Sequence, residues 1–227
     1  MIYSLTETKM YSMQTERNEI VNYGKKLITS NLTTGSGGNL SIINRETGLV
    51  AVSPSGIEYL DMQPEDVVVV DLQGRVKEGS CTPSSELSAH LGLYRIREDI
   101  GAVLHTHSVY ATTIACLHWE LPAVHYLVGF AGTKVPLAPY ATYGSEELAD
   151  NVCTTIGPSN AVLLANHGLI AVGKDLKTAF VIAEEIELVA RIYYQARAVG
   201  EPVILPDEEM ERVIAKFTTY GQTRSGE

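Results

Sequence analysis

Hydrophobic residues recur at helical spacing in several stretches of the chain. Ile20, Val21, Leu27 and Ile28 fall on one face of a helix predicted over residues 15–31. Similar patterns predict further helices at residues 84–97, 110–116, 145–156, 175–199 and 206–217. Asp175 is a typical N-cap for the longest of these helices, and Gly200 is a typical stop signal.

Short apolar runs bounded by turn residues predict strands between these helices. The runs cover residues 40–43, 49–52, 67–70, 102–105, 161–164 and 169–172. Strands and helices are interleaved along the chain, which is typical of the α/β class. Because pairs of strands follow each other through short turns, we expect an antiparallel or mixed sheet rather than a purely parallel one.

The composition is that of an ordinary globular protein, with 45% hydrophobic and 19% charged residues among 227. No repeat or low-complexity linker divides the chain, so we expect one domain over residues 1–227. The net charge of −10 argues against broad binding to nucleic acid or to an anionic membrane. It leaves room for a small anionic ligand, because backbone N–H groups can bind phosphate in an acidic protein.

Two further features bear on where the protein works. No apolar run approaches the roughly 18 residues needed to cross a bilayer, and residues 1–13 lack the basic start and apolar centre of a signal peptide. The cysteines Cys81, Cys116 and Cys153 are far apart and odd in number, which indicates free thiols in a reducing compartment. We therefore expect a cytoplasmic protein.

The segment His105-Thr106-His107 carries the most informative polar pattern. Side chains of a strand alternate between its faces, so two imidazoles two residues apart lie on the same side. The apolar run that leads into the pair favours an extended conformation. Two imidazoles at a strand end can share one metal ion, and they can equally be ordinary residues satisfied by hydrogen bonds.

Other residues are candidates for completing a metal site. His167 falls in a loop between two predicted strands, and Glu86 lies at the start of a predicted helix. Three imidazoles and one carboxylate form a full set of ligands for zinc or a similar divalent ion. Spacing alone does not choose the third histidine, for which His90, His118 and His125 compete.

Three short segments have the composition of anion-binding loops. They are the glycine-rich segment 35–39, the turn at residues 53–56, and Ser84-Ser85 at the expected start of a helix. Glycine lets the backbone approach a ligand, and a helix N-terminus offers unpaired N–H groups. Each segment alone is also an ordinary turn or helix cap, so together they favour a phosphate-bearing ligand only modestly.

Tyrosines provide a further set of candidates, because a phenol can relay a proton in an active site. Most tyrosines serve packing, and that is the default for each one here. The candidates are Tyr126, Tyr140, Tyr143 and Tyr220.

Eight motifs, taken in order, resemble the class II aldolase/adducin family. They span nearly the whole chain, about residues 16 to 221, and eight motifs with similar gaps form a specific signal although each alone is weak. The motifs are residues 35–41 (GSGGNLS), 53–56 (SPSG), 83–86 (PSSE), 105–107 (HTH), 123–126 (AVHY), 139–144 (PYATYG), 166–170 (NHGLI) and 216–221 (KFTTYG).

The resemblance implies a fold and a set of site residues. The fold would be a single-domain, three-layer α/β/α arrangement around a mixed, largely antiparallel sheet. The resemblance implies a catalytic Zn²⁺ on His105, His107 and His167, with Glu86 as a fourth ligand when substrate is absent. It also implies that the substrate phosphate is held by Gly38, Asn39, Ser55, Gly56, Ser84 and Ser85. The other histidines would then be structural.

The resemblance also implies a reaction, namely metal-dependent aldol cleavage of a sugar phosphate. A divalent ion can stabilise the enediolate as a Lewis acid, so no Schiff-base lysine is needed. Glu86 would be the acid/base at the reacting carbon, and Tyr126 would handle the proton on the hydroxyl formed from the aldehyde. Tyr220 would reach the site of a neighbouring subunit in a homotetramer with sites between subunits. The expected substrate is L-fuculose 1-phosphate, cleaved to dihydroxyacetone phosphate and L-lactaldehyde.

A few positions depart from the family pattern. Ser36 and Gly37 replace the usual threonine and alanine, and Ser55 stands where threonine is common. These changes keep the hydroxyl or the backbone freedom that phosphate binding needs. Tyr143 stands where a close relative has phenylalanine, near the aldehyde end of the site, so the aldehyde preference is less defined.

Three alternatives to this function remain. The L-ribulose-5-phosphate 4-epimerase branch uses the same metal site but typically has Asp in place of Glu86. A second alternative is an aldolase for 5-deoxypentulose 1-phosphates, which sequence separates poorly because an aldehyde pocket tolerates small apolar changes. The third is an adducin-like structural protein, which would be expected to lack the histidine triad. Metal identity also stays open, because these ligands suit other divalent ions.

Overall fold

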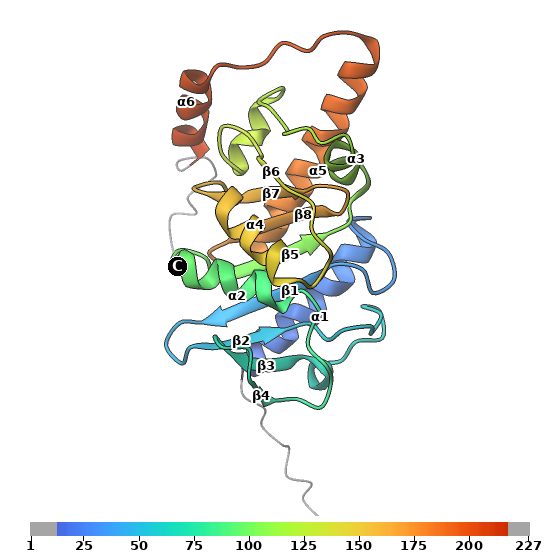
Figure 1. Cartoon of the computed structure of the whole chain (residues 1–227), viewed down its shortest axis with the longest axis vertical. Helices are drawn as coiled ribbons and strands as arrows, with labels where there is room; N and C mark the ends of the chain where they lie inside the picture. The colour runs from blue at the N-terminus through green and yellow to red at the C-terminus, as the bar shows by residue number, and fades with distance from the viewer. Residues whose placement is uncertain (1–12, 218–227) are drawn as a thin grey trace, which may run out of the picture.

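The computed structural model describes residues 13–217, and it confirms the α/β class with a single mixed sheet of eight strands in that part of the chain (Figure 1). The sheet order is β4-β3-β2-β1-β5-β8-β7-β6, and every neighbouring pair is antiparallel except β6 and β7. The strands are β1 (Asn39–Asn44), β2 (Leu49–Val52), β3 (Val68–Asp71), β4 (Val76–Glu78), β5 (Ala102–Thr106), β6 (Leu137–Ala138), β7 (Ala161–Leu164) and β8 (Gly168–Gly173).

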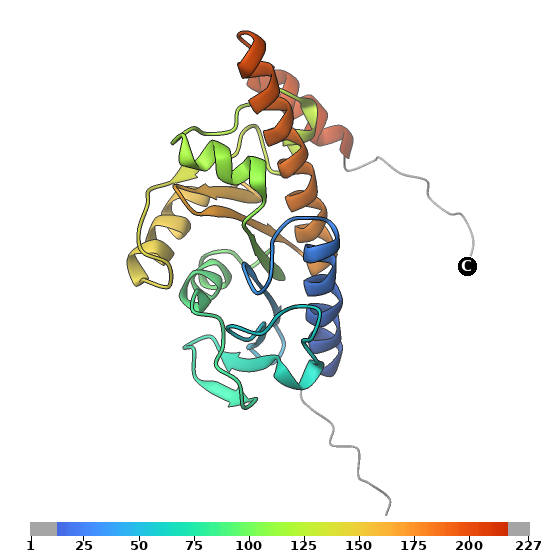
Figure 2. The ribbon, with the colours of Figure 1, turned by 90° about the vertical axis from the view of Figure 1, so that its right-hand side faces the viewer.

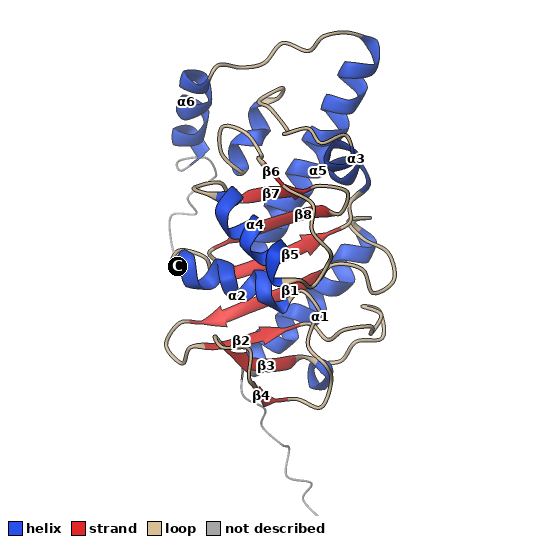
Figure 3. Cartoon of the chain, in the orientation of Figure 1, coloured by secondary structure: helices blue, strands red, loops and turns tan. Residues whose placement is uncertain are grey.

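Helices cover both faces of this sheet and give the expected three layers (Figure 3). Figure 2 shows α1 and α5 against one face, with α2 and α4 on the other. The helices are α1 (Gln14–Thr29), α2 (Leu87–Ile96), α3 (Val109–Cys116), α4 (Glu146–Ile156), α5 (Leu176–Val199) and α6 (Asp207–Phe217), with short 3₁₀ helices η1 (Pro64–Asp66) and η2 (Tyr126–Phe130).

Alternation along the strands explains why the sheet needs helices on both sides. In β5, Leu104 packs into the core beneath α1 and α5, whereas Val103 packs into the second core beneath α2 and α4. Both side chains are fully buried. Burial of one such side chain stabilises the fold by about 1.5–3 kcal/mol, so neither face of the sheet can be left open to water. No helix in the described range is long and apolar enough to span a membrane.

The structure confirms the predicted helices and strands, with one shifted boundary that matters for the site. The helix predicted from Ser84 begins at Leu87, because residues 84–86 form a turn instead. The Ser84 N–H donates to the Ser53 carbonyl, and the Glu86 N–H donates to the Ser84 hydroxyl. Sequence patterns missed β4, β6, η1 and η2, which are too short to show a periodicity.

Candidate metal and phosphate site

The three predicted histidines meet at one edge of the central strands. His105 is on β5, which lies between β1 and β8, and His107 follows directly after β5 ends. His167 belongs to the turn that joins β7 to β8. The ring centroid of His105 lies 4.8 Å from the ring centroids of His107 and His167. One nitrogen atom of each ring lies within 4.8 Å of a nitrogen atom of each other ring.

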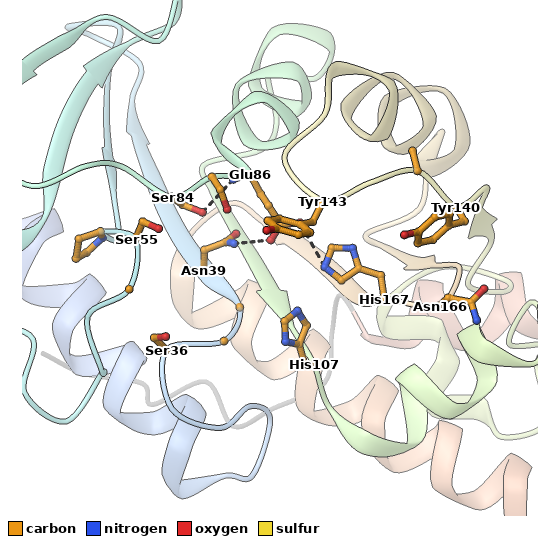
Figure 4. Close-up of a pocket in the computed structure, with 16 residues that line it drawn as sticks. Ser36, Asn39, Ser55, Ser84, Glu86, His107, Tyr140, Tyr143, Asn166 and His167 are labelled. Atoms are coloured by element: carbon orange, nitrogen blue, oxygen red, sulfur yellow. Dashed lines mark hydrogen bonds and ion pairs between the residues drawn. The ribbon is translucent and has the colours of Figure 1, made fainter.

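Glu86 adds a carboxylate to this cluster from the start of α2. It is the N-cap residue of α2, and its side chain points toward the histidines across the site (Figure 4). Its Oε2 lies 3.3 Å from His105 Nε2, and its Oε1 lies 3.4 Å from His167 Nε2. The turn at residues 84–86 therefore places a carboxylate beside three imidazoles that are carried by β5 and by segments next to the sheet strands.

The protonation of these groups leaves lone pairs facing one another. Burial lowers the pKa of His105 to about 3, so its ring is neutral at pH 7. Its Nδ1 lies 3.0 Å from the Leu169 carbonyl and donates to it, so its Nε2 carries no proton. That bare nitrogen lies 3.0 Å from His107 Nε2 and faces the Glu86 carboxylate. The bare His105 nitrogen and the carboxylate fit a divalent cation between them, with the Leu169 carbonyl orienting the His105 ring.

The net charge of the cluster also favours a cation. Burial raises the pKa of Glu86. The nearby imidazoles of His105 and His167 and the hydrogen bond from Asn39 lower this pKa by more, so it lies below its usual value. Burial lowers the pKa of His107 as well. The site is thus two neutral imidazoles and His167 beside a charged carboxylate, which is a ligand set suited to zinc.

A cavity of about 360 Å³ opens beside this cluster. Its lining includes Glu86, His107 and His167. It also brings together all six residues predicted to bind phosphate, namely Gly38, Asn39, Ser55, Gly56, Ser84 and Ser85. No lysine or arginine is among the described residues that line it. An anion there would be held by backbone N–H groups and hydroxyls instead of side-chain cations.

The backbone at this cavity is arranged for such a role. In the described part of the chain, the N–H groups of Gly38, Gly56 and Ser85 donate no hydrogen bond. Gly38 and Gly56 have φ values of +71° and +73°, a region that favours glycine. A Cβ on Gly38 would lie 2.4 Å from the His105 carbonyl oxygen. Glycine is therefore needed at position 38, where the glycine-rich loop passes close to the strand that carries His105.

The Asn39 side chain has a contact that sequence reasoning did not foresee. Its Nδ2 donates to Glu86 Oε2 at 2.8 Å, and the residue is buried (Figure 4). Asn39 thus touches the acid/base candidate as well as the cavity. A glycine-rich motif predicts backbone approach to a ligand, but nothing in it points to a partner 47 residues away.

Tyr140, Tyr143 and Asn166 also line the cavity, and of these three only the tyrosines had been singled out as candidates in the sequence. The rings of Tyr140 and Tyr143 lie beside it and are largely exposed (Figure 4). Asn166 was not singled out as a site residue, although its place directly before His167 was a signal. Its backbone is left-handed, with φ +53°. The His118 ring donates to the Asn166 side chain at 2.6 Å.

The remaining histidines do not join the triad. His90 is fully buried and bonds to Asn39 and Ser41. His125 accepts the Leu127 N–H at the start of η2.

Of the two tyrosines predicted to be catalytic, Tyr126 is not among the described residues that line this cavity. Tyr126 is 48% exposed and lies in a separate groove of about 490 Å³ beside Phe130 and Phe217. Tyr220 lies outside the described residues. The catalytic role of Tyr126 therefore stays a prediction.

Comparisons with known proteins agree with this geometry. The model of the Class II Aldolase and Adducin N-terminal domain matches residues 18–194. A 5-deoxy-D-ribulose 1-phosphate aldolase of Bacillus thuringiensis serovar kurstaki is 59% identical over 92% of this chain and 99% of its own. An L-fuculose phosphate aldolase of Escherichia coli is 37% identical over 91% and 97%. A solved structure named L-fuculose 1-phosphate aldolase superposes with a TM-score of 0.90 at 49% identity, covering 92% of this chain and 98% of its own.

These findings overturn the expected substrate. The prediction of L-fuculose 1-phosphate is wrong, because the 59% identical relative is named for a different sugar and the curated fuculose enzyme is far less similar. Most of the motifs were expected to hold a metal or a phosphate, features that would serve either substrate. The motifs do not define the aldehyde preference, because a pocket for a small aldehyde discriminates only weakly between substrates that differ by one carbon.

Proposed function

We propose that this chain, which belongs to the class II aldolase and adducin family, is a metal-dependent aldolase for 5-deoxy-D-ribulose 1-phosphate. Breaking the bond between C3 and C4 of this ketose gives dihydroxyacetone phosphate and acetaldehyde. The observation that carries the substrate is the 59% identity with the Bacillus thuringiensis enzyme over almost the full length of both chains. The triad, the carboxylate and the loops that share one cavity support the reaction class.

The ion would be held by His105, His107 and His167, with Glu86 in reach, and we propose Zn²⁺. When bound, the ion supplies Lewis-acid stabilisation of the negative charge that develops on the substrate oxygens. The chain's own contribution is to keep the imidazoles neutral and oriented. Burial of His105 and its bond to the Leu169 carbonyl do this before any ligand arrives.

The phosphate would occupy the cavity against the free N–H groups of Gly38, Gly56 and Ser85. The hydroxyls of Ser55 and Ser84 lie in the same lining. These contacts anchor the unreactive end of the substrate and so position the reacting carbon, which contributes orientation rather than chemistry.

Glu86 is the proposed acid/base. In the synthetic direction its carboxylate takes a proton from C3 of dihydroxyacetone phosphate, and in cleavage it returns that proton. The lowered pKa of Glu86 keeps it ionised and ready to accept. Tyr126, from a neighbouring subunit, would supply the proton to the new hydroxyl, and Tyr220 would enter the same site.

The alternatives fit the residues less well. An epimerase of this family would be expected to carry Asp in place of Glu86. An adducin-like structural role would not need three histidines brought to within 4.8 Å of one another. We further propose a homotetramer with sites between subunits, working in the cytoplasm, where the free cysteines stay reduced.

Product analysis tests this function. Zinc-loaded enzyme is incubated with 5-deoxy-D-ribulose 1-phosphate, and acetaldehyde and dihydroxyacetone phosphate are measured in separate coupled assays. Equal amounts of both products, lost on chelation and regained with added metal, are expected. Conversion of L-ribulose 5-phosphate to its epimer, with no cleavage of any ketose 1-phosphate, would reject the aldolase.

A further inference from the structure

A buried chain of polar side chains runs from the second core to the Glu86 carboxylate. Tyr94 Oη lies 2.8 Å from Ser41 Oγ, which lies 2.7 Å from His90 Nδ1. His90 Nε2 lies 2.5 Å from Asn39 Oδ1, and the Asn39 amide reaches Glu86 Oε2. Exposure is 4% or less for the four residues behind Glu86.

The donor and acceptor in every hydrogen bond of this series follow from the Glu86 carboxylate at its end. An ionised carboxylate only accepts, so Asn39 must present its NH₂ group to Glu86 and its carbonyl oxygen to His90. His90 Nε2 must then carry the ring proton. Burial lowers the pKa of His90 to about 4, so the ring is neutral and its Nδ1 accepts from Ser41. Ser41 in turn accepts from the Tyr94 hydroxyl.

The geometry points to His90 as a positioning residue that fixes the Asn39 amide so that it donates to Glu86. Without the Nε2–H of His90, the amide is free to rotate and to place its oxygen against the carboxylate. Two acceptors would then oppose each other in a buried place, which turns the Glu86 carboxylate from its position. The role of Glu86 in proton transfer belongs to the proposed function, and the inference rests on it in that respect.

Glu86 has two oxygens in different surroundings, which gives the chain a specific effect. Oε2 is held by Asn39 and faces His105, whereas Oε1 faces His167. The chain from Tyr94 therefore fixes one oxygen and leaves the other to exchange protons. Outer hydrogen bonds of this kind typically change activity by about 10–100-fold when they are removed.

Three variants separate positioning from simple stability. His90→Phe removes the donor, and His90→Gln restores an N–H near the place of Nε2. Leu93→Ala, three residues along the same helix, removes buried packing without touching the chain of polar groups. The readout is exchange of the C3 proton of dihydroxyacetone phosphate with solvent, measured for zinc-loaded folded protein, with metal content and KM determined alongside.

We expect His90→Phe to lose about 10–100-fold in the maximal exchange rate with little change in KM or bound zinc. His90→Gln should regain most of that loss, and Leu93→Ala should exchange at the wild-type rate per folded molecule. Equal losses in His90→Phe and His90→Gln, or a wild-type rate in His90→Phe, would overturn the inference.

Nitrogen NMR of ¹⁵N-histidine-labelled, zinc-loaded wild-type protein gives a second readout that needs no substrate. The His90 signals, assigned by their loss in His90→Gln, should show the proton on Nε2. A proton on Nδ1 overturns the inference whatever the activities of the variants. Failure to cleave 5-deoxy-D-ribulose 1-phosphate, with exchange and the Nε2–H intact, would reject the proposed substrate and leave the role of His90 standing.

Discussion

At the scale of single residues, the site depends on how neighbours set the charge of Glu86. Burial alone would raise its pKa, and the imidazoles and Asn39 reverse that effect. Glutamine at this position keeps the shape of the Glu86 side chain but neither accepts nor returns a proton. We therefore expect Glu86→Gln to keep the fold and lose about 10²–10⁴-fold in proton exchange on dihydroxyacetone phosphate.

The control for this variant is Glu98→Gln, an exposed carboxylate beyond the end of α2. It should exchange protons at the wild-type rate. Exchange by Glu86→Gln at the same rate as this control would remove Glu86 from its proposed role.

Sequence reasoning reached the metal ligands but not the residues that orient them. His105 and His107 stood out because strand alternation puts residues i and i+2 on one side. His167 and Glu86 were candidates from their positions, but only the family motifs chose His167 over His90, His118 and His125. The bond between Asn39 and Glu86 could not be foreseen, because it joins the start of β1 to the turn before α2, which only the fold brings together.

At the scale of elements, the triad depends on how closely β8 approaches β5. A Cβ on Gly168, the first residue of β8, would lie 2.3 Å from the Thr106 carbonyl oxygen and 3.2 Å from both the His105 and His107 rings. Gly168→Ala must push the strands apart or move these imidazoles. We expect zinc affinity to fall by about 10–100-fold, measured by competition with a chelator.

Gly200 supplies a matched control for that substitution, because it has open space around its Cα and an extended φ of 176°. Gly200→Ala should bind zinc as tightly as the wild type. Equal affinity in both variants would show that the triad tolerates a displaced β8.

The start of α5 offers a prediction with a defined pH dependence. Asp175 caps the helix by accepting the Thr178 N–H at 2.7 Å. Burial raises the pKa of Asp175, but the bonds from Thr178 and the nearby lysines outweigh it, so the pKa is lowered. A lowered pKa stabilises the fold above the unfolded value of about 4, and that stability is lost as the pH falls through the folded value.

Asp175→Ala should therefore cost about 1 kcal/mol in the free energy of unfolding at pH 7. The difference from the wild type should shrink in urea melts carried out below about pH 4. A difference that stays constant down to low pH would show that the carboxylate charge does not support the cap.

Element types were predictable where the pattern was long, and boundaries were not. The cap at Asp175 and the stop at Gly200 placed α5 correctly because both signals are local. The start of α2 was placed too early, since Ser84 resembles an N-cap while its N–H is used by Ser53. That partner lies 31 residues away and leaves no trace in the local sequence.

At the scale of the whole molecule, the groove that holds Tyr126 has no part in the cavity of its own chain. Sites shared between subunits predict complementation between two inactive variants. Glu86→Gln and Tyr126→Phe subunits are mixed by reversible dissociation. At equal mixing, random assembly into a closed ring should restore about a quarter of wild-type cleavage activity. Mixtures no more active than either variant alone would place Tyr126 outside the site or inside its own chain.

The sequence carried the architecture and reaction class but not the sugar. Hydrophobic alternation predicted a mixed sheet between helical layers, and the motifs predicted a metal and a phosphate. The aldehyde end was expected near Tyr143, an exposed residue of the motif at residues 139–144. A difference of one hydroxyl there can shift substrate preference while the motif stays recognisable.

The central claim is that the enzyme acts on a 5-deoxypentulose 1-phosphate. The most direct measurement is kcat/KM for 5-deoxy-D-ribulose 1-phosphate and for L-fuculose 1-phosphate on the same zinc-loaded preparation, through release of dihydroxyacetone phosphate. The second substrate places one extra hydroxylated carbon in the aldehyde pocket. We predict a preference of about tenfold or more for 5-deoxy-D-ribulose 1-phosphate. An equal or higher value for L-fuculose 1-phosphate would contradict the account.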